Sequence, residues 1–193
     1  MAFEKAGWHQ WGGKMQDDVT DATRWAIAQA IADKERICIC GGSYGGYAAL
    51  EGAVSVPDLY KCAIGHVGVY NLPDMLGRRG AAQTLYSERY WQRTMGTDET
   101  TLAQRSPVYQ LGNLKARVML VVGGRDTIVL PVQSQEMHMA MLKRKIPHEW
   151  LYKPDEWHGF YDEKNIAELF ERVDAFLDAN IGAGAQAMAA ATK

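Results

Sequence analysis

The hydrophobic positions of this chain gather in four short, predominantly apolar runs. They lie at 37–40, 62–67, 117–122 and 148–152. Short apolar runs without a clear polar alternation are typical of parallel strands that helices cover on both faces. The pattern therefore predicts a parallel sheet of four strands.

Longer segments with helical character separate these runs and follow the last of them. Apolar positions recur at helical spacing over 15–33, and Pro131 begins a predicted helix over 131–145. The clearest helix is predicted over 165–180, where one apolar stripe is formed by Ile166, Leu169, Phe170, Val173, Phe176 and Leu177. The segment 71–112 shows short helical pieces and no strand pattern. Strands alternating with helices predict one α/β domain, a mostly parallel sheet flanked by helices on both faces.

The junction after the first run is the most informative part of the chain. Gly41-Gly42-Ser43-Tyr44-Gly45-Gly46 lies between a predicted strand and a predicted helix. Gly41-x-Ser43-x-Gly45 is the nucleophile-elbow pattern, in which a strained turn presents a serine hydroxyl above a parallel sheet. The glycines avoid clashes that β-carbons would make there, and the helix N-terminus favours nearby negative charge. We predict Ser43 as a nucleophile rather than part of a nucleotide-binding turn, because the P-loop lysine is missing.

Two further residues with suitable chemistry follow later strands. Asp126 comes after the third run and His158 after the fourth, and functional groups in parallel sheets gather beyond the carboxyl ends of the strands. The order Ser, Asp, His is that of α/β-hydrolases. A neutral imidazole would take the serine proton, and a carboxylate would fix its tautomer and stabilise the imidazolium. These residues predict acyl transfer by a catalytic triad on an α/β-hydrolase fold.

The sequence leaves alternatives open for Asp126 and His158. An alternative role for Asp126 is merely to cap the following helix. Its rival as the orienting carboxylate is Asp155, which lies too close in sequence to His158 to orient it from another strand. His66, at the end of the second run, could reach the cleft, but the pattern offers it no partner, and a lone histidine near the edge of a core is usually structural. We expect His138 to lie on the surface. The histidines that compete with His158 as the base are His9, His66, His138 and His148.

Composition and charge exclude several classes of function. The 193 residues, 47% of them hydrophobic, suit one domain, and a net charge of −2 gives no electrostatic footprint for nucleic acid. No apolar run approaches the roughly 20 residues that a membrane span needs, and no signal peptide is visible. An Asp–His pair lacks the third ligand that a catalytic zinc needs, so we expect neither a metal nor an organic cofactor.

The cysteines are Cys38, Cys40 and Cys62. The first two are two residues apart on one predicted strand, so they point to the same face and are poorly placed to bond each other. With an odd number of thiols that we expect to be buried, the sequence predicts no disulfide framework. This is compatible with a reducing compartment. Localisation stays open, with the cytoplasm favoured over the periplasm or secretion.

The motifs together resemble the catalytic domain of the prolyl oligopeptidase family. The resemblance rests on 41–50, Arg105-Ser106-Pro107, the segment from Asp126 to Pro131, His158-Gly159-Phe160 and the opening 5–13. It spans about residues 3 to 182 and is nearest to dipeptidyl aminopeptidases and acylaminoacyl peptidases. It implies that 1–182 is the C-terminal part of an α/β-hydrolase peptidase domain. Residues 183–193 are rich in Ala and Gly and are expected to be a disordered tail.

The resemblance implies a function and the roles of individual residues. It implies a serine peptidase that cleaves short peptides near their N-terminus, with Ser43 as nucleophile, Asp126 as orienter and His158 as base. Tyr44 would donate a backbone N–H to the oxyanion hole. Tyr44, Val69, Tyr86 and Val129 would form the substrate pocket.

The segment after Tyr86, Ser87-Glu88-Arg89-Tyr90, resembles the dipeptidyl peptidase version of this pocket. An equally plain interpretation is that Tyr86 and Tyr90 only pack under a long loop. Two other positions depart from the family pattern. Ile128 replaces a residue that is often polar, and Trp157 replaces a common glycine and would narrow the cleft.

The largest departure is at the start of the chain. Family members carry an N-terminal β-propeller and further strands before the nucleophile, together with a loop that supplies the second oxyanion-hole donor. We therefore expect a chain that associates through the exposed edge of the 37–40 strand, or with a missing N-terminal part, and that hydrolyses peptides poorly.

Other functions remain compatible with the residues. A carboxylesterase or thioesterase of the same fold would use the same triad, because the chemistry is acyl transfer in each case. A catalytically weak fragment, kept for association, is the third hypothesis. The segments 8–13 and 87–90 favour the peptidase.

Overall fold

Four parallel strands form the central sheet of the computed structural model, which describes residues 2–77, 85–183 and 185. The strands follow in the order β1 (Cys38–Gly42), β2 (Cys62–His66), β3 (Arg117–Gly123) and β4 (His148–Lys153). Each neighbouring pair is parallel, so the carboxyl ends of the strands lie along one edge of the sheet. The predicted α/β class is confirmed, and the four apolar runs match the strands to within two residues.

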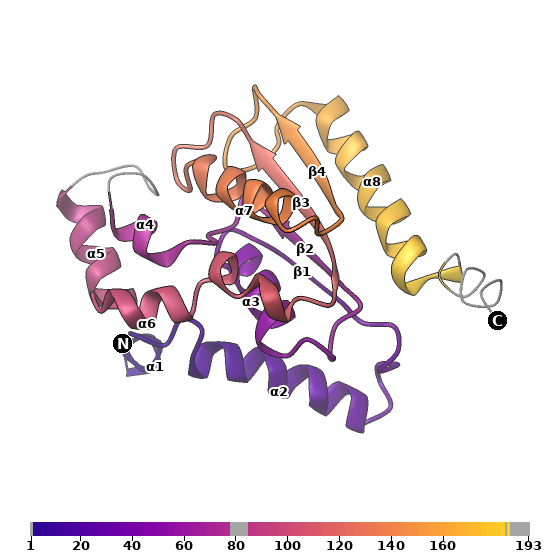
Figure 1. Cartoon of the computed structure of the whole chain (residues 1–193), viewed down its shortest axis with the longest axis horizontal. Helices are drawn as coiled ribbons and strands as arrows, with labels where there is room; N and C mark the ends of the chain where they lie inside the picture. The colour runs from indigo at the N-terminus through magenta and orange to yellow at the C-terminus, as the bar shows by residue number, and fades with distance from the viewer. Residues whose placement is uncertain (1, 78–84, 184, 186–193) are drawn as a thin grey trace.

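Helices connect the strands and cover both faces of the sheet (Figure 1). They are α1 (Ala2–Ala6), α2 (Lys14–Ala28), α3 (Tyr44–Ser55), α4 (Leu72–Leu76), α5 (Leu85–Met95), α6 (Glu99–Gln104), α7 (Val132–Lys143) and α8 (Glu163–Ile181), with short 3-10 helices at Pro107–Tyr109 and Leu111–Asn113. Two boundaries differ from the sequence interpretation. Residues 2–6 are helical, and α2 ends before residue 33 because Ala30 takes a positive φ of 55°.

Apolar side chains of three helices bury the two faces of the sheet. On one face, α3 and α7 pack Leu50 and Met137 against Val118 and Leu120 of β3. On the other face, the predicted stripe of α8 covers the strands, with Phe176 in contact with a cluster formed by Cys62, Ile64, Met119, Val121 and Leu151. The strands are therefore apolar on both sides, which explains why their sequences lack a period of two.

A third apolar cluster lies around the start of α3 and brings the N-terminal loop to the carboxyl edge of the sheet. Trp11 packs there with Tyr47 and Val69. Arg105 holds the loop in place, because its Nη1 donates to the carbonyl oxygens of His9 (3.0 Å) and Trp11 (3.2 Å). Tyr47 in turn donates its hydroxyl to the carbonyl of Arg105 at 3.0 Å. Residues far apart in the sequence thus meet beside the elbow.

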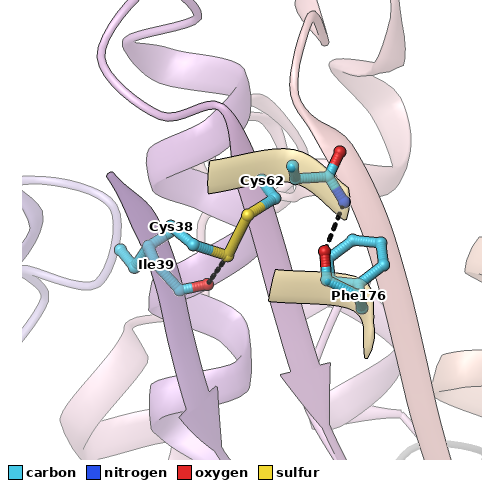
Figure 2. Close-up of a disulfide and its surroundings, with 5 residues drawn as sticks. Cys38, Ile39, Cys62 and Phe176 are labelled. Atoms are coloured by element: carbon cyan, nitrogen blue, oxygen red, sulfur yellow. Dashed lines mark hydrogen bonds between the residues drawn. A yellow bond between two sulfur atoms is a disulfide. The ribbon is translucent and has the colours of Figure 1, made fainter. Parts of the chain in front are cut away.

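The structure pairs Cys38 with Cys62 in a disulfide, which corrects the expectation of unpaired cysteines (Figure 2). The two residues are direct register partners on β1 and β2, and their Cα atoms are 4.5 Å apart. Cys40, which we expected to be buried, is exposed. Strand register cannot be read from spacing along the chain, so the bond was not visible in the sequence. The argument from free thiols to a reducing compartment therefore does not hold.

The C-terminal boundary stays a prediction. Helix α8 ends at Ile181, and most of the predicted tail at 183–193 lies outside the described residues. Among the helices of the described part, none is both long and apolar enough to cross a membrane.

Candidate active site

Ser43 occupies a strained turn between β1 and α3. Its φ of 58° and ψ of −120° are unusual for a residue with a side chain, and its N–H donates to the carbonyl of His66 at 2.9 Å. A β-carbon at Gly41 would lie 2.4 Å from the backbone of Gly45, and one at Gly46 would lie 2.9 Å from the Cα of Gly68. Gly45 itself has open space. Two of the motif's glycines are therefore required by packing, and Gly45 is not.

The three residues proposed from strand order meet over the edge of the sheet. His158 Nε2 lies 2.9 Å from Ser43 Oγ, and His158 Nδ1 lies 2.7 Å from Asp126 Oδ2. The side chains come from three different strand ends, and His158 is 115 residues from Ser43 along the chain. With the proton on Nδ1, the ring can donate to Asp126 and accept from the serine hydroxyl.

Asp126 is held by its own backbone as well as by the histidine. Its side chain is 1% exposed, and Oδ1 accepts the N–H groups of Ile128 (2.8 Å) and Val129 (3.0 Å). Asp126 does not cap the following helix α7, which begins at Val132 after Pro131 without a side-chain cap; its second oxygen binds the turn directly after it instead. Because one oxygen binds the turn, the other stays directed at the imidazole.

His66 lies close to this cluster but contributes its backbone rather than its ring. Desolvation and the neighbouring His158 lower the pKa of His66, so its imidazole is neutral at pH 7. The ring packs edge-on against Phe160 at a centroid distance of 5.0 Å. The carbonyl of His66 lies beside the elbow, where it accepts the N–H of Ser43.

His138 is half-buried on α7, and its ring contacts two residues of β4. It stacks on Trp150 at 4.3 Å, and its Nδ1 lies 2.7 Å from His148 Nε2. His138 lies on α7 and His148 on β4, and the contacts of the two rings do not involve Ser43. Neither ring takes the place of His158.

Tyr44 is the first residue of α3 and directly follows Ser43. Backbone N–H groups in the first turn of a helix have no acceptor within the helix, so this one is available beside the serine. Burial, with a contribution from Asp18, raises the pKa of the Tyr44 phenol to about 12, so the side chain is neutral. The oxyanion role stays a prediction for its N–H.

A cavity of about 270 Å³ opens next to Ser43. Tyr44, Val69 and Val129 line it, and their role in binding substrate stays a prediction. The side chain of Tyr86 falls outside the described residues. Trp157, expected to narrow the cleft, is exposed and is not among the residues that line the cavity.

Most of the remaining wall comes from residues that sequence reasoning did not select. Trp11 of the N-terminal loop packs edge-on against Tyr44 at 4.7 Å and against Trp91 of α5 at 6.1 Å. Tyr90 also lines the cavity, so it does more than pack under a loop. Ile128 lies at the same wall, where the family pattern suggested a polar group. The signal that could have found Trp11 was its place in the 5–13 motif.

Within the part of the chain that the structure describes, no group of three or more His, Cys, Asp or Glu side chains is arranged to hold a metal ion.

Comparison with known proteins identifies the family of this chain. Residues 1–184 match the prolyl oligopeptidase family. This chain belongs to the prolyl oligopeptidase family of serine-type peptidases. The catalytic-domain resemblance drawn from the motifs is thereby confirmed.

Individual relatives agree with the family match. The chain is 33% identical over 189 residues to dipeptidyl aminopeptidase BIII of Pseudoxanthomonas mexicana, covering 95% of this chain and 27% of the relative. It is 23% identical over 172 residues to the acylamino-acid-releasing enzyme of Mus musculus, covering 86% of this chain and 23% of the relative. A solved puromycin-hydrolysing peptidase of Mycobacterium tuberculosis superimposes with a TM-score of 0.84 at 27% identity, over 92% of this chain and 27% of that one. The chain thus spans about a quarter of the length of the curated relatives it matches.

Proposed function

We propose that this chain is a serine peptidase that releases a dipeptide or an acylated amino acid from a short peptide, with Ser43, His158 and Asp126 as its triad. The observation that carries the proposal is the continuous hydrogen-bond chain from Asp126 Oδ2 through the imidazole to Ser43 Oγ. The names of the relatives, a dipeptidyl aminopeptidase and an acylamino-acid-releasing enzyme, favour peptides over other acyl substrates.

The proposed reaction proceeds in two acyl transfers. Ser43 Oγ attacks the scissile carbonyl carbon while His158 Nε2 takes the hydroxyl proton. The carbonyl oxygen becomes an oxyanion beside the N–H of Tyr44, where the N-terminus of α3 stabilises negative charge. The C–N bond then breaks, and the imidazolium gives its proton to the leaving amine. Water repeats the sequence on the acyl-enzyme and restores the serine.

Asp126 would act on the imidazole rather than on the substrate. Its ionised carboxylate keeps the Nδ1 proton in place and stabilises the imidazolium that forms during each attack. The hydrogen bonds from Ile128 and Val129 to Oδ1 prevent this carboxylate from turning away. The residue therefore serves orientation and charge together.

The cavity supports a preference for an apolar side chain before the scissile bond. Its walls include the rings of Trp11, Tyr44 and Trp91, which offer wide apolar surfaces and edge contacts. Burying a large apolar side chain of the substrate there contributes about 1.5–3 kcal/mol. We expect peptides with an aromatic or large aliphatic residue at this position to react faster than those with a charged one.

A fluorophosphonate probe tests the proposal directly. We expect labelling at Ser43 that is lost in Ser43→Ala and reduced by several orders of magnitude in His158→Ala. Comparing dipeptidyl and acylaminoacyl p-nitroanilides with a p-nitrophenyl ester then separates the peptidase from the carboxylesterase alternative. Labelling without any hydrolysis would favour the weak-fragment hypothesis, and labelling that persists in His158→Ala would contradict the triad.

Self-association stays a prediction. Within the described residues, β1 pairs only with β2, so its other edge offers unpaired backbone groups to another strand. Light scattering of the purified chain is expected to show a dimer or larger species, and a monomer at all concentrations would contradict this.

A further inference from the structure

Glu156 is a buried carboxylate two residues before His158. The residue is 2% exposed, yet the proposed reaction gives it no chemical step. Burying a carboxylate is unfavourable unless hydrogen bonds compensate. The hydrogen bonds of the Glu156 carboxylate must therefore compensate for its burial.

The carboxylate binds three donors that all lie after His158 in the chain. Oε2 accepts the N–H of Tyr161 at 2.8 Å, and Oε1 accepts the N–H of Asp162 at 3.1 Å and the amide of Asn165 at 2.8 Å. The bonds join the residue that precedes the histidine loop, 157–160, to the residues that follow it. The loop is thereby closed around His158.

The residues that follow the histidine loop are fixed to helix α8. Asp162 is the N-cap of α8, and its own carboxylate accepts the N–H groups of Lys164 and Asn165. Helix α8 packs on the sheet through Phe176. The histidine loop is therefore anchored to the core rather than only to its neighbours.

The backbone of Glu156 makes a second connection, to the strand end that carries Asp126. Its carbonyl accepts the N–H of Arg125 at 2.7 Å. It also lies so close to the end of β3 that a β-carbon at Gly123 would approach it to 2.7 Å. One residue thus connects the segments that bear the acid and the base of the triad.

The ionisation state of Glu156 fits this arrangement. Burial opposes the charged form, but the hydrogen bonds from Asn165, Tyr161 and Asp162 outweigh it and lower the pKa of the carboxyl group. An ionised carboxylate only accepts hydrogen bonds, which matches a site that contains only donors. A side-chain amide would place one of its own N–H groups against a donor.

We propose that Glu156 is a positioning residue for His158. Its carboxylate and its carbonyl hold loop 157–160 so that the imidazole stays aligned between Asp126 and Ser43. This inference rests on the proposed function, because alignment matters only if the three residues react together. A displacement of about 1 Å in such a group can lower a rate about 100-fold.

The test compares Glu156→Gln with Asp155→Asn in the full chain. Asp155 is adjacent and also carboxylic, but its side chain is 72% exposed and forms an ion pair with the Arg125 guanidinium at 2.6 Å. We expect Glu156→Gln to slow fluorophosphonate labelling and lower kcat by about 10- to 100-fold, with KM changed less than about twofold. Asp155→Asn should stay within about twofold of the unaltered chain.

A proton NMR spectrum supplies a readout that does not depend on turnover. The His158 Nδ1 proton, shared with Asp126, should give a strongly deshielded resonance that broadens or moves upfield in Glu156→Gln. If that variant does not fold, Asn165→Ala removes one of the three donors and should give a smaller loss of about threefold. Unchanged rates and an unchanged resonance in the folded variant overturn the proposal, as does an unaffected Asn165→Ala.

The two proposals fail in different ways. If the unaltered chain is never labelled at Ser43, the proposed function fails, but a resonance that responds to Glu156→Gln still supports the positioning role. If labelling is normal and insensitive to Glu156→Gln, the function stands and the positioning role is refuted.

Discussion

Two buried glutamates lie in the two halves of the candidate active site, and the pKa values of their carboxyl groups are shifted in opposite directions. Glu51 lies on α3, the helix that begins after Ser43, and is 3% exposed, while Glu156 is 2% exposed. Desolvation by burial raises the pKa of Glu51 to about 7, and the hydrogen bonds that its carboxylate accepts from Gln110 offset this only in part. Three donors lower the pKa of Glu156 instead. Both residues are almost inaccessible to water, but Glu51 lies deeper in the protein and has fewer hydrogen-bond donors than Glu156, and both differences favour its neutral form.

Ser43 and His158, the proposed nucleophile and base, are also held in different ways. The turn at Ser43 is fixed by backbone packing, with Gly41 and Gly46 in contact with other main-chain atoms. The loop at His158 is fixed by the side chain of Glu156. We expect the elbow to be sensitive to added volume and the histidine loop to be sensitive to lost hydrogen bonds.

The largest expected effect is a loss of catalytic efficiency on substitution of Asp126, whose carboxylate contacts His158. In Asp126→Asn the side-chain oxygen can keep the bonds to Ile128 and Val129, which leaves the amide N–H₂ facing His158 Nδ1. The ring must then take the wrong tautomer, and kcat/KM should fall about 10³- to 10⁴-fold with little loss of stability. Steady-state kinetics with a p-nitroanilide checks this, with Asp155→Asn as the control. A loss below about tenfold would mean that Asp126 does not orient the base.

A second prediction separates volume from hydrogen bonding. Gly41→Ala places a β-carbon 2.4 Å from the backbone of Gly45, so we expect a loss of about 3 kcal/mol in the free energy of unfolding. Gly159→Ala, in the histidine loop, meets nothing closer than 3.9 Å and should change stability by about 0.5 kcal/mol. Urea unfolding measures both.

Gly45→Ala is the control within the elbow itself. Its β-carbon enters open space at the start of α3, so the fold should be kept and stability gained by up to about 1 kcal/mol. Equal damage from Gly41→Ala and Gly45→Ala would show that the elbow is not held by packing.

The smallest effect concerns Glu51 and depends on pH. Its pKa is about 7 in the folded protein against 4.5 for an ordinary glutamate, so the folded state binds more protons between these values and stability falls as the pH rises. Glu51→Gln removes this titration. Its gain in unfolding free energy should be small near pH ~4.5 and rise to at most about 3 kcal/mol above pH ~7.

Urea unfolding at about pH 5 and about pH 8 tests this expectation, with the exposed Glu171→Gln on α8 as the control. Glu171→Gln should show no such pH dependence. A gain from Glu51→Gln that is the same at both pH values would mean that this carboxyl is not neutralised by burial, and the contrast with Glu156 would be lost.

Local patterns along the chain were enough to predict the strands, the elbow and the order of the proposed triad residues. Apolar runs, glycine spacing and the turn after each strand are local properties, and the parallel arrangement then brings Ser43, Asp126 and His158 to one edge. The register that joins Cys38 to Cys62 and the position of Trp11 in the pocket wall depend instead on how distant segments pack. Glu156 likewise acquires its donors only when residues 161–165 fold back on it, because such contacts depend on packing between segments that no local pattern encodes.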